Sequence, residues 1–153
     1  MQFKIVVGTA LFLACAFNYS CTGMSAECRQ FFLEQRLEEA EAKFKTYPRE
    51  KQLELYFCGM KVEPPELWPA VAIADEGAQV IPFLLDRLKT ENELNQYNII
   101  YIFEFLAMKG HLRGKPEVIL QLKQVVSVMK HHVIKKEAQQ SLENIEKYSS
   151  KTS

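Results

Sequence analysis

Asn95-Gln-Tyr-Asn-Ile-Ile-Tyr-Ile-Phe-Glu-Phe-Leu-Ala-Met108 decides the fold, because its apolar residues leave almost no polar face. A helix that is hydrophobic on all sides is buried in the core of a protein. The Ile, Tyr and Phe residues of this stretch would also suit a buried strand, and periodicity alone does not separate the two. The segments before and after it carry helical spacing, so we predict a central, buried helix.

The neighbouring segments repeat apolar residues every three or four positions, which is the spacing of a helix with one buried face. Proline and glycine stand between them, because the residue before a proline leaves the helical region and a glycine favours a left-handed cap. The expected helices span 25–44, 49–60, 66–74, 80–88, 95–108, 116–129 and 134–148. The first should bury Leu33 and Leu37 on its apolar stripe. We therefore predict an all-α fold of about six to seven short antiparallel helices behind an N-terminal signal helix.

One corner of the sequence resembles a known repeat family. Ile73-Ala-Asp-Glu-Gly-Ala-Gln-Val-Ile-Pro-Phe-Leu-Leu85 combines an acidic pair, a glycine and a Val-x-Pro-x-Leu-Leu helix start. This combination resembles the helix–helix corner of HEAT-type repeats, and the similarity extends over residues 65–148. The resemblance implies a small α-α superhelix that serves as a protein-binding scaffold, and it implies no catalytic residues.

The N-terminus has the layout of a secretory signal. Met1-Gln-Phe-Lys4 carries one positive charge, Ile5 to Phe17 is mostly apolar, and a short polar patch ends at Cys21. The apolar run would make a helix of about 20 Å, against about 30 Å of bilayer hydrocarbon, so it suits a cleaved signal better than a membrane span. We expect residues 1–20 to be removed on export; an uncleaved helix packed on the domain is the alternative.

Two cleavage sites compete in this region. Phe17-Asn-Tyr-Ser-Cys21 resembles a bacterial lipoprotein signal, which would make Cys21 the lipidated first residue of the mature chain, although Asn18 stands where such signals carry leucine. Ala14-Cys15-Ala16 is a small-x-small site, and cleavage after Ala16 would leave no lipid. The cysteine count favours cleavage before Cys21. Cys15 would then leave with the signal and Cys21 would carry the lipid, so that two cysteines remain to pair. We therefore expect a lipid-anchored protein of the cell envelope, on the periplasmic or extracellular side.

Cleavage before Cys21 would leave Cys28 and Cys58 as a possible pair. An oxidising compartment would allow them to form a disulfide, which would tie the first helix to the second. In the chain-entropy view, such a bridge contributes about 3 to 4 kcal/mol to stability. Two unpaired, buried thiols are the alternative.

Composition indicates one globular domain, residues 21–148, followed by a disordered polar tail, residues 149–153. The chain is 48% hydrophobic and 25% charged, which excludes a disordered protein, and its net charge is zero. The charge is unevenly distributed: Ser25 to Phe105 holds nine Lys/Arg and fifteen Asp/Glu, whereas Met108 to Ser153 holds nine and four. The basic residues of the second part are scattered and form no basic-aromatic motif, so we expect no nucleic-acid partner.

The residues that could contact a partner are acidic or aromatic. Glu34, Glu38 and Glu41 lie on the first expected helix, and Trp68 stands between prolines, where it could form a binding edge or pack in the core. The leading functional hypothesis is a protein-interaction module of the cell envelope. The alternative is a periplasmic immunity or inhibitor protein that uses its acidic surface against a basic toxin or enzyme.

Catalytic and metal-binding motifs are missing from the sequence. Glu104 is an acid within the apolar central stretch, where it could serve as a general acid or be paired or directed outward. His111 stands apart, and the adjacent side chains of His131 and His132 are expected to diverge, with no Cys or Asp at ligand spacing. We therefore expect no metal, no cofactor and no enzyme activity; an unrecognised hydrolase that uses Glu104 is a further alternative.

Overall fold

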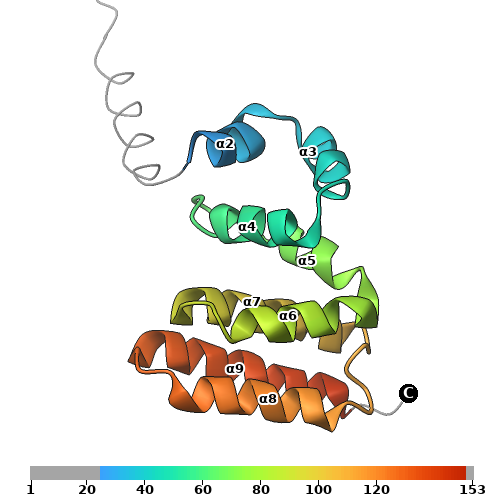
Figure 1. Ribbon diagram of the computed structural model, residues 1–153, viewed down its shortest axis with the longest axis vertical. Coiled ribbons are helices and arrows are strands. Elements are labelled where there is room, and N and C mark those ends of the chain that lie inside the picture. Colours follow the sequence, from blue (N-terminus) through green and yellow to red (C-terminus); the bar gives the residue numbers. More distant parts are fainter. Residues whose placement is uncertain (1–24, 151–153) are drawn as a thin grey trace, which may run out of the picture. The chain divides into compact units, whose positions relative to one another are not determined.

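The computed structural model describes residues 25–150, which divide into two compact units between Leu67 and Trp68. Over these residues the chain forms eight α-helices, one π-helical turn and one 3-10 turn, and it contains no strand (Figure 1). The prediction of an all-α fold is confirmed. The predicted signal, residues 1–20, and the lipidation site Cys21 lie outside the described residues.

Unit 1 contains three α-helices and the π turn. Its elements are α2 (Ala26–Arg29), the π turn η1 (Gln30–Glu34), α3 (Leu37–Phe44) and α4 (Arg49–Gly59). The predicted end of the second expected helix before Pro64 is confirmed. The predicted continuous first helix is wrong, because the backbone is extended at Gln35 (φ −99°, ψ 153°) and at Arg36 (φ −69°, ψ 145°).

Aromatic packing explains this break. The ring of Phe31 lies 6.4 Å from that of Phe44 and 6.3 Å from that of Tyr47, measured between centroids. In one straight helix Phe31 and Phe44 would be separated by about 20 Å along the axis, so their rings could not meet. Breaking the helix allows both phenylalanines to be buried together, and burial of each such side chain is worth about 2 kcal/mol.

A buried side chain fixes the turn from α3 to α4. Gln52 is only 7% exposed, and its amide nitrogen donates hydrogen bonds to the carbonyl oxygens of Phe44 (3.2 Å) and Tyr47 (3.1 Å). Phe44 is the last residue of α3 and its carbonyl oxygen also accepts from the backbone amide of Tyr47 (3.1 Å), so Gln52 adds a second donor there and ties the turn to α4. Pro48 then precedes the first residue of α4, as the sequence predicts.

Unit 2 contains five α-helices joined by short turns. They are α5 (Trp68–Ala74), α6 (Ile81–Leu88), α7 (Glu93–Met108), α8 (Pro116–Val128) and α9 (His132–Ser149), with the 3-10 turn η2 (Gly77–Val80) before α6. Gly77 has a φ of 75°, which confirms the predicted left-handed corner after α5. Pro82 lies in the first turn of α6, where its missing amide hydrogen costs no hydrogen bond.

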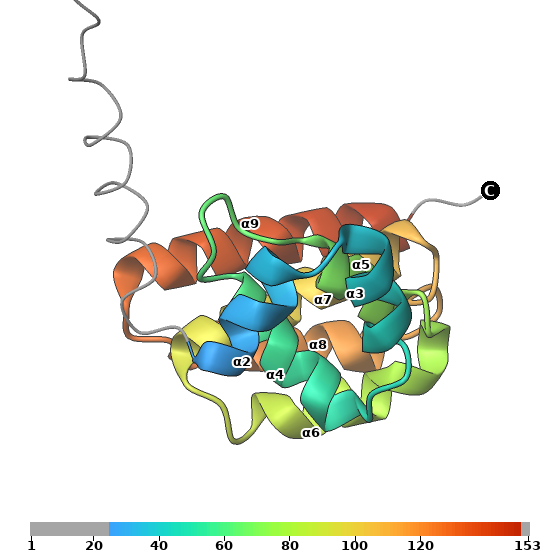
Figure 2. The ribbon, with the colours of Figure 1, turned by 90° about the horizontal axis from the view of Figure 1, so that it is seen from above.

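The predicted central helix is confirmed as α7. Ile99, Ile100, Ile102, Phe103 and Leu106 have no exposed surface, and α7 packs against α5, α6 and α9. It runs parallel to α9, whereas α8 runs antiparallel to α9. Figure 1 shows α6 and α7 as one pair of neighbouring helices and α8 and α9 as the next. Figure 2 shows the turn that joins α8 to α9 at the end of α9 opposite to the C-terminus.

Candidate functional site

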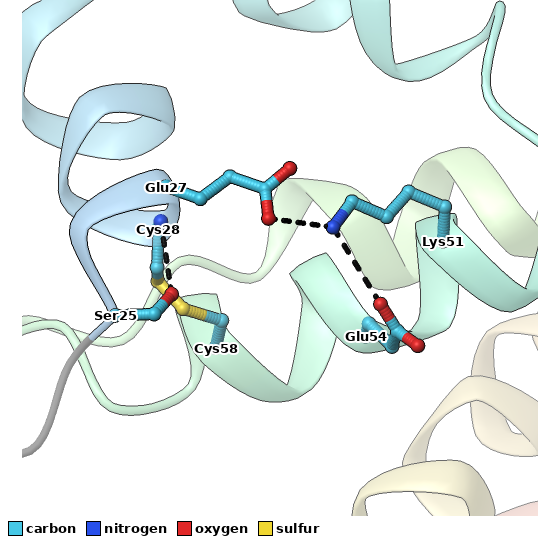
Figure 3. Close-up of a disulfide and its surroundings, with 6 residues drawn as sticks. All are labelled: Ser25, Glu27, Cys28, Lys51, Glu54 and Cys58. Atoms are coloured by element: carbon cyan, nitrogen blue, oxygen red, sulfur yellow. Dashed lines mark hydrogen bonds and ion pairs between the residues drawn. A yellow bond between two sulfur atoms is a disulfide. The ribbon is translucent and has the colours of Figure 1, made fainter.

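A disulfide joins the first and last helices of unit 1. It links Cys28 of α2 to Cys58 of α4, with 6.1 Å between their Cα atoms, a separation that a disulfide normally spans (Figure 3). Cys28 is buried, and its backbone amide donates to the side-chain oxygen of Ser25 (3.2 Å), which caps α2. The pairing predicted from the cysteine count is therefore present.

A charged contact lies beside this disulfide. The ammonium group of Lys51 is 2.8 Å from the carboxylate of Glu27 on α2 and 3.6 Å from that of Glu54 on its own helix (Figure 3). The hydrogen bond to Glu27 raises the pKa of Lys51, against a smaller opposing effect of desolvation. Surface ion pairs of this kind contribute little to stability. The disulfide therefore links α2 to α4 more strongly than this ion pair does.

The break between η1 and α3 exposes a mixed acidic and apolar surface. Leu33 and Leu37, which flank the break, are 50% and 54% exposed. Glu34 and Glu38 follow them directly and are also exposed, and Glu41 lies one turn further along α3 and is half-buried. We call these five residues the Leu33–Glu41 surface.

The three glutamates of this surface are predicted from the sequence, whereas the exposure of its two leucines is not. Leu33 and Leu37 were expected on the buried stripe of one continuous helix, and that expectation is wrong because the helix ends between them. The ion pair between Arg36 and Glu38 spans 3.9 Å and both side chains are 80% exposed, so it neutralises little of the acidic charge.

Trp68 belongs to the other unit. It is the first residue of α5 and is half-buried, whereas Glu34, Glu38 and Glu41 all lie in unit 1. The four residues predicted as one possible interaction surface are therefore distributed over both units. The three glutamates lie together in unit 1, within eight residues of the sequence on either side of the break.

Glu104 connects two helices of unit 2. Its carboxylate accepts a hydrogen bond of 2.9 Å from the side-chain amide of Asn144 on α9, and its side chain is half-buried. On the same helix, burial raises the pKa values of Tyr97 and Tyr101, and the charge of Glu104 raises both further. The partner of Glu104 is thus the amide of Asn144 and not the Arg, Lys or Tyr hydroxyl that the sequence suggests. An amide does not titrate and cannot exchange a proton with the carboxylate.

The adjacent histidines lie at the start of α9. His131 caps the helix, because its Nδ1 atom accepts from the backbone amide of Ile134 at 3.5 Å. The rings of His131 and His132 are parallel, with 5.6 Å between centroids, so the predicted divergence of these side chains is wrong. Within residues 25–150, no group of three His, Cys, Asp or Glu side chains lies close enough to hold a metal ion.

Two shallow depressions lie between α8 and α9. Their volumes are about 320 and 400 Å³, and both are lined by Pro116, Ile119 and Glu146. An ion pair between Lys123 of α8 and Glu146 of α9 stands at their border. The carboxylate of Glu146 thus already has a cationic partner, and the other polar side chains at the first depression are those of Lys115, Ser149 and Ser150.

Comparison with known proteins identifies no relative. The chain matches no family model, no curated protein and no solved structure. Among residues 25–150, no helix combines the length and the apolar character needed to span a bilayer. Function must therefore be inferred from the exposed surfaces of the two units and from the chemistry of the side chains on them.

Proposed function

We propose that this chain is a non-enzymatic protein-interaction module, exported and held at the cell envelope by a lipid on Cys21. The observation that carries this proposal is the exposure of Leu33 and Leu37 among the glutamates of the Leu33–Glu41 surface. An exposed apolar patch that is rimmed by charged residues commonly marks a protein-binding site. The acidic rim favours a partner with a basic, apolar contact region.

The arrangement of unit 2 supports a scaffold of the HEAT type. The carboxylate of Glu93, at the start of α7, contacts the turn before α9, and Glu104 contacts Asn144 further along, so α7 and α9 run parallel. Successive helix pairs of an α-α superhelix stack in this way. We propose that α6 to α9 form two such pairs, and that α5 is the extra helix before them.

The disulfide supports export. Disulfides persist in oxidising compartments and are rare in the cytosol, where thiols are kept reduced. A Cys28–Cys58 bridge therefore agrees with removal of the predicted signal, residues 1–20, and with a mature chain that begins at Cys21. Lipidation of Cys21 would place unit 1 close to the membrane surface.

Photo-crosslinking in cells tests the proposed surface. A photoreactive amino acid in place of Leu37 should capture a protein partner, since Leu37 is 54% exposed and belongs to the Leu33–Glu41 surface. The matched control is the same substitution at Leu94 of unit 2, which is 48% exposed. A specific band from position 37 alone supports the proposal. No band above background from either position would count against it.

An immunity or inhibitor protein that neutralises a basic toxin or enzyme is the second candidate. The acidic side chains of Glu34, Glu38 and Glu41 favour it, because such proteins cover the basic surface of their targets with opposite charge. Reversal of these three charges to lysine should abolish salt-sensitive capture of the partner. Reversal of Glu117, Glu137 and Glu143, exposed on unit 2, is the control with the same change in net charge. If the captured partner is an enzyme that the chain inhibits, the second candidate replaces the first.

A further inference from the structure

The turn between α8 and α9 exposes apolar and basic side chains together. Val128, the last residue of α8, is 72% exposed, and Val133, near the start of α9, is 51% exposed. Between and beside them stand exposed basic and imidazole side chains, and the segment from 128 to 136 contains no acidic residue. We call this set the α8–α9 corner: Val128, Lys130, His131, His132, Val133 and Lys136.

The carboxylate of Glu93, on α7, accepts hydrogen bonds from the backbone of this corner. One carboxylate oxygen accepts from the backbone amide of Lys130 (2.7 Å), and the other accepts from that of His131 (2.8 Å). The ammonium group of Lys135 donates to the carbonyl oxygen of Ser127 (2.7 Å), which gives one carbonyl group at the end of α8 a hydrogen-bond donor. These hydrogen bonds connect the turn to the start of α7 and to the end of α8, and both oxygens of the Glu93 carboxylate are engaged with backbone amides.

The cations at the tip remain available to a partner. Neither Lys130 nor Lys136 forms an ion pair with a carboxylate among the described residues, although both are exposed. In contrast, Lys109 and Lys123 of the same unit are paired with Asp75 and Glu146. The corner thus presents two exposed lysines without a carboxylate partner among the described residues, which favours a negatively charged partner.

We propose that the α8–α9 corner docks on an anionic lipid surface, with the lysines at the headgroups and Val128 and Val133 at the boundary of the acyl chains. The composition of the corner favours lipid over an acidic protein. Protein interfaces are depleted in lysine, and their strongest contacts are made by Trp, Tyr and Arg, none of which occurs between 128 and 136. Lysines near an anionic bilayer and exposed aliphatic side chains both favour membrane contact. This docking depends neither on a lipid at Cys21 nor on a protein partner.

Amine labelling of the full chain tests the proposal directly. The chain is mixed with an excess of vesicles of phosphatidylcholine, with or without phosphatidylglycerol, and its lysines are acylated and quantified by mass spectrometry. Lys130 and Lys136 should react several-fold more slowly on anionic vesicles only. Lys45 and Lys61 of unit 1 are exposed and serve as internal controls, and their reactivity should be equal on both vesicles. This readout works whether or not the N-terminal segment also anchors the chain.

A charge-reversal pair provides the second measurement. The ratio of binding to anionic over neutral vesicles should fall about tenfold or more in K130E/K136E, because each lysine close to an anionic surface contributes strongly to binding. The control K45E/K61E changes the net charge equally and should leave the ratio unchanged; circular dichroism confirms that both variants are folded. The proposal is overturned if Lys130 and Lys136 label equally on both vesicles. Protection by polyglutamate without protection by anionic vesicles would overturn it in favour of an acidic protein partner.

Discussion

The two units of this chain reach a folded state by different means. In unit 1 the α-helices have 4, 8 and 11 residues and are joined by a disulfide. In unit 2, α7, α8 and α9 have 16, 13 and 18 residues and pack through apolar faces. Short helices are marginal in isolation and bury little surface, so a small unit gains most from a covalent link. Long apolar helices provide their own core.

The largest effect should come from the core of unit 2. Phe103→Ala removes a fully buried ring from the centre of α7 and should cost about 3 to 5 kcal/mol of unfolding free energy. Urea unfolding followed by circular dichroism measures this loss. Phe105→Ala, on the half-buried side of the same helix, should cost clearly less. Equal losses in the two variants would mean that α7 is not the core of unit 2.

Removal of the disulfide tests how far unit 1 depends on it. The double variant Cys28→Ser and Cys58→Ser should lose about 3 to 4 kcal/mol of stability, because the unfolded chain is no longer constrained. Hydrogen exchange should become faster in residues 25–67 and remain unchanged in residues 68–150. Equally accelerated exchange in both ranges would show that the two units unfold together. The disulfide would then stabilise both units and not unit 1 alone.

The buried amide of Gln52 should have an intermediate effect. Gln52→Ala leaves the carbonyl oxygens of Phe44 and Tyr47 without their side-chain donor, which should cost about 1 to 3 kcal/mol. Thermal unfolding of the variant measures the loss. Gln79→Ala removes an exposed glutamine in unit 2 and should leave the melting temperature almost unchanged. A similar shift in both variants would argue against a structural role for the Gln52 amide.

The smallest effect should come from Glu93, and it should depend on pH. The amides of Lys130 and His131 lower the pKa of this exposed carboxylate, with the contact to Lys130 as the larger cause. A lowered pKa in the folded state adds stability above the ordinary glutamate pKa, and this stability is lost as the pH falls through the folded value. The melting temperature of the wild type should therefore be higher than that of Glu93→Gln at neutral pH, and the difference should shrink in acid. A melting difference that does not change with pH would contradict this assignment; Glu117→Gln is the control.

The helices of unit 2 could be predicted because their signals are local. The apolar run around Ile99 and Ile100 and the glycine at the corner after α5 are visible in the sequence, and the structure confirms both. The break at Gln35 could not be predicted, because Glu34-Gln-Arg36 contains neither glycine nor proline. It depends on the contact of Phe31 with Phe44, which is a tertiary interaction.

The candidate surfaces could be predicted only in part, because they too depend on tertiary contacts. The glutamates of the Leu33–Glu41 surface could be named from the sequence, but the exposure of its leucines depends on the break. In the sequence, Lys130 and Lys136 are two of the scattered basic residues of the second part of the chain. They form a corner because α8 ends at Val128 and because Glu93, 37 residues before Lys130, holds the turn.

The disulfide also determines how the chain bears mechanical load. A pulling force applied between the two ends passes from Cys28 to Cys58 through the covalent bond, so the residues between them are shielded from tension. While the disulfide is intact, the stretched chain is shorter by about 100 Å, the extended length of the residues between Cys28 and Cys58. Unit 2 has no such shortcut among its described residues and must resist the force by packing alone. A protein tethered by its N-terminus would thus yield first in the unit with the larger apolar core.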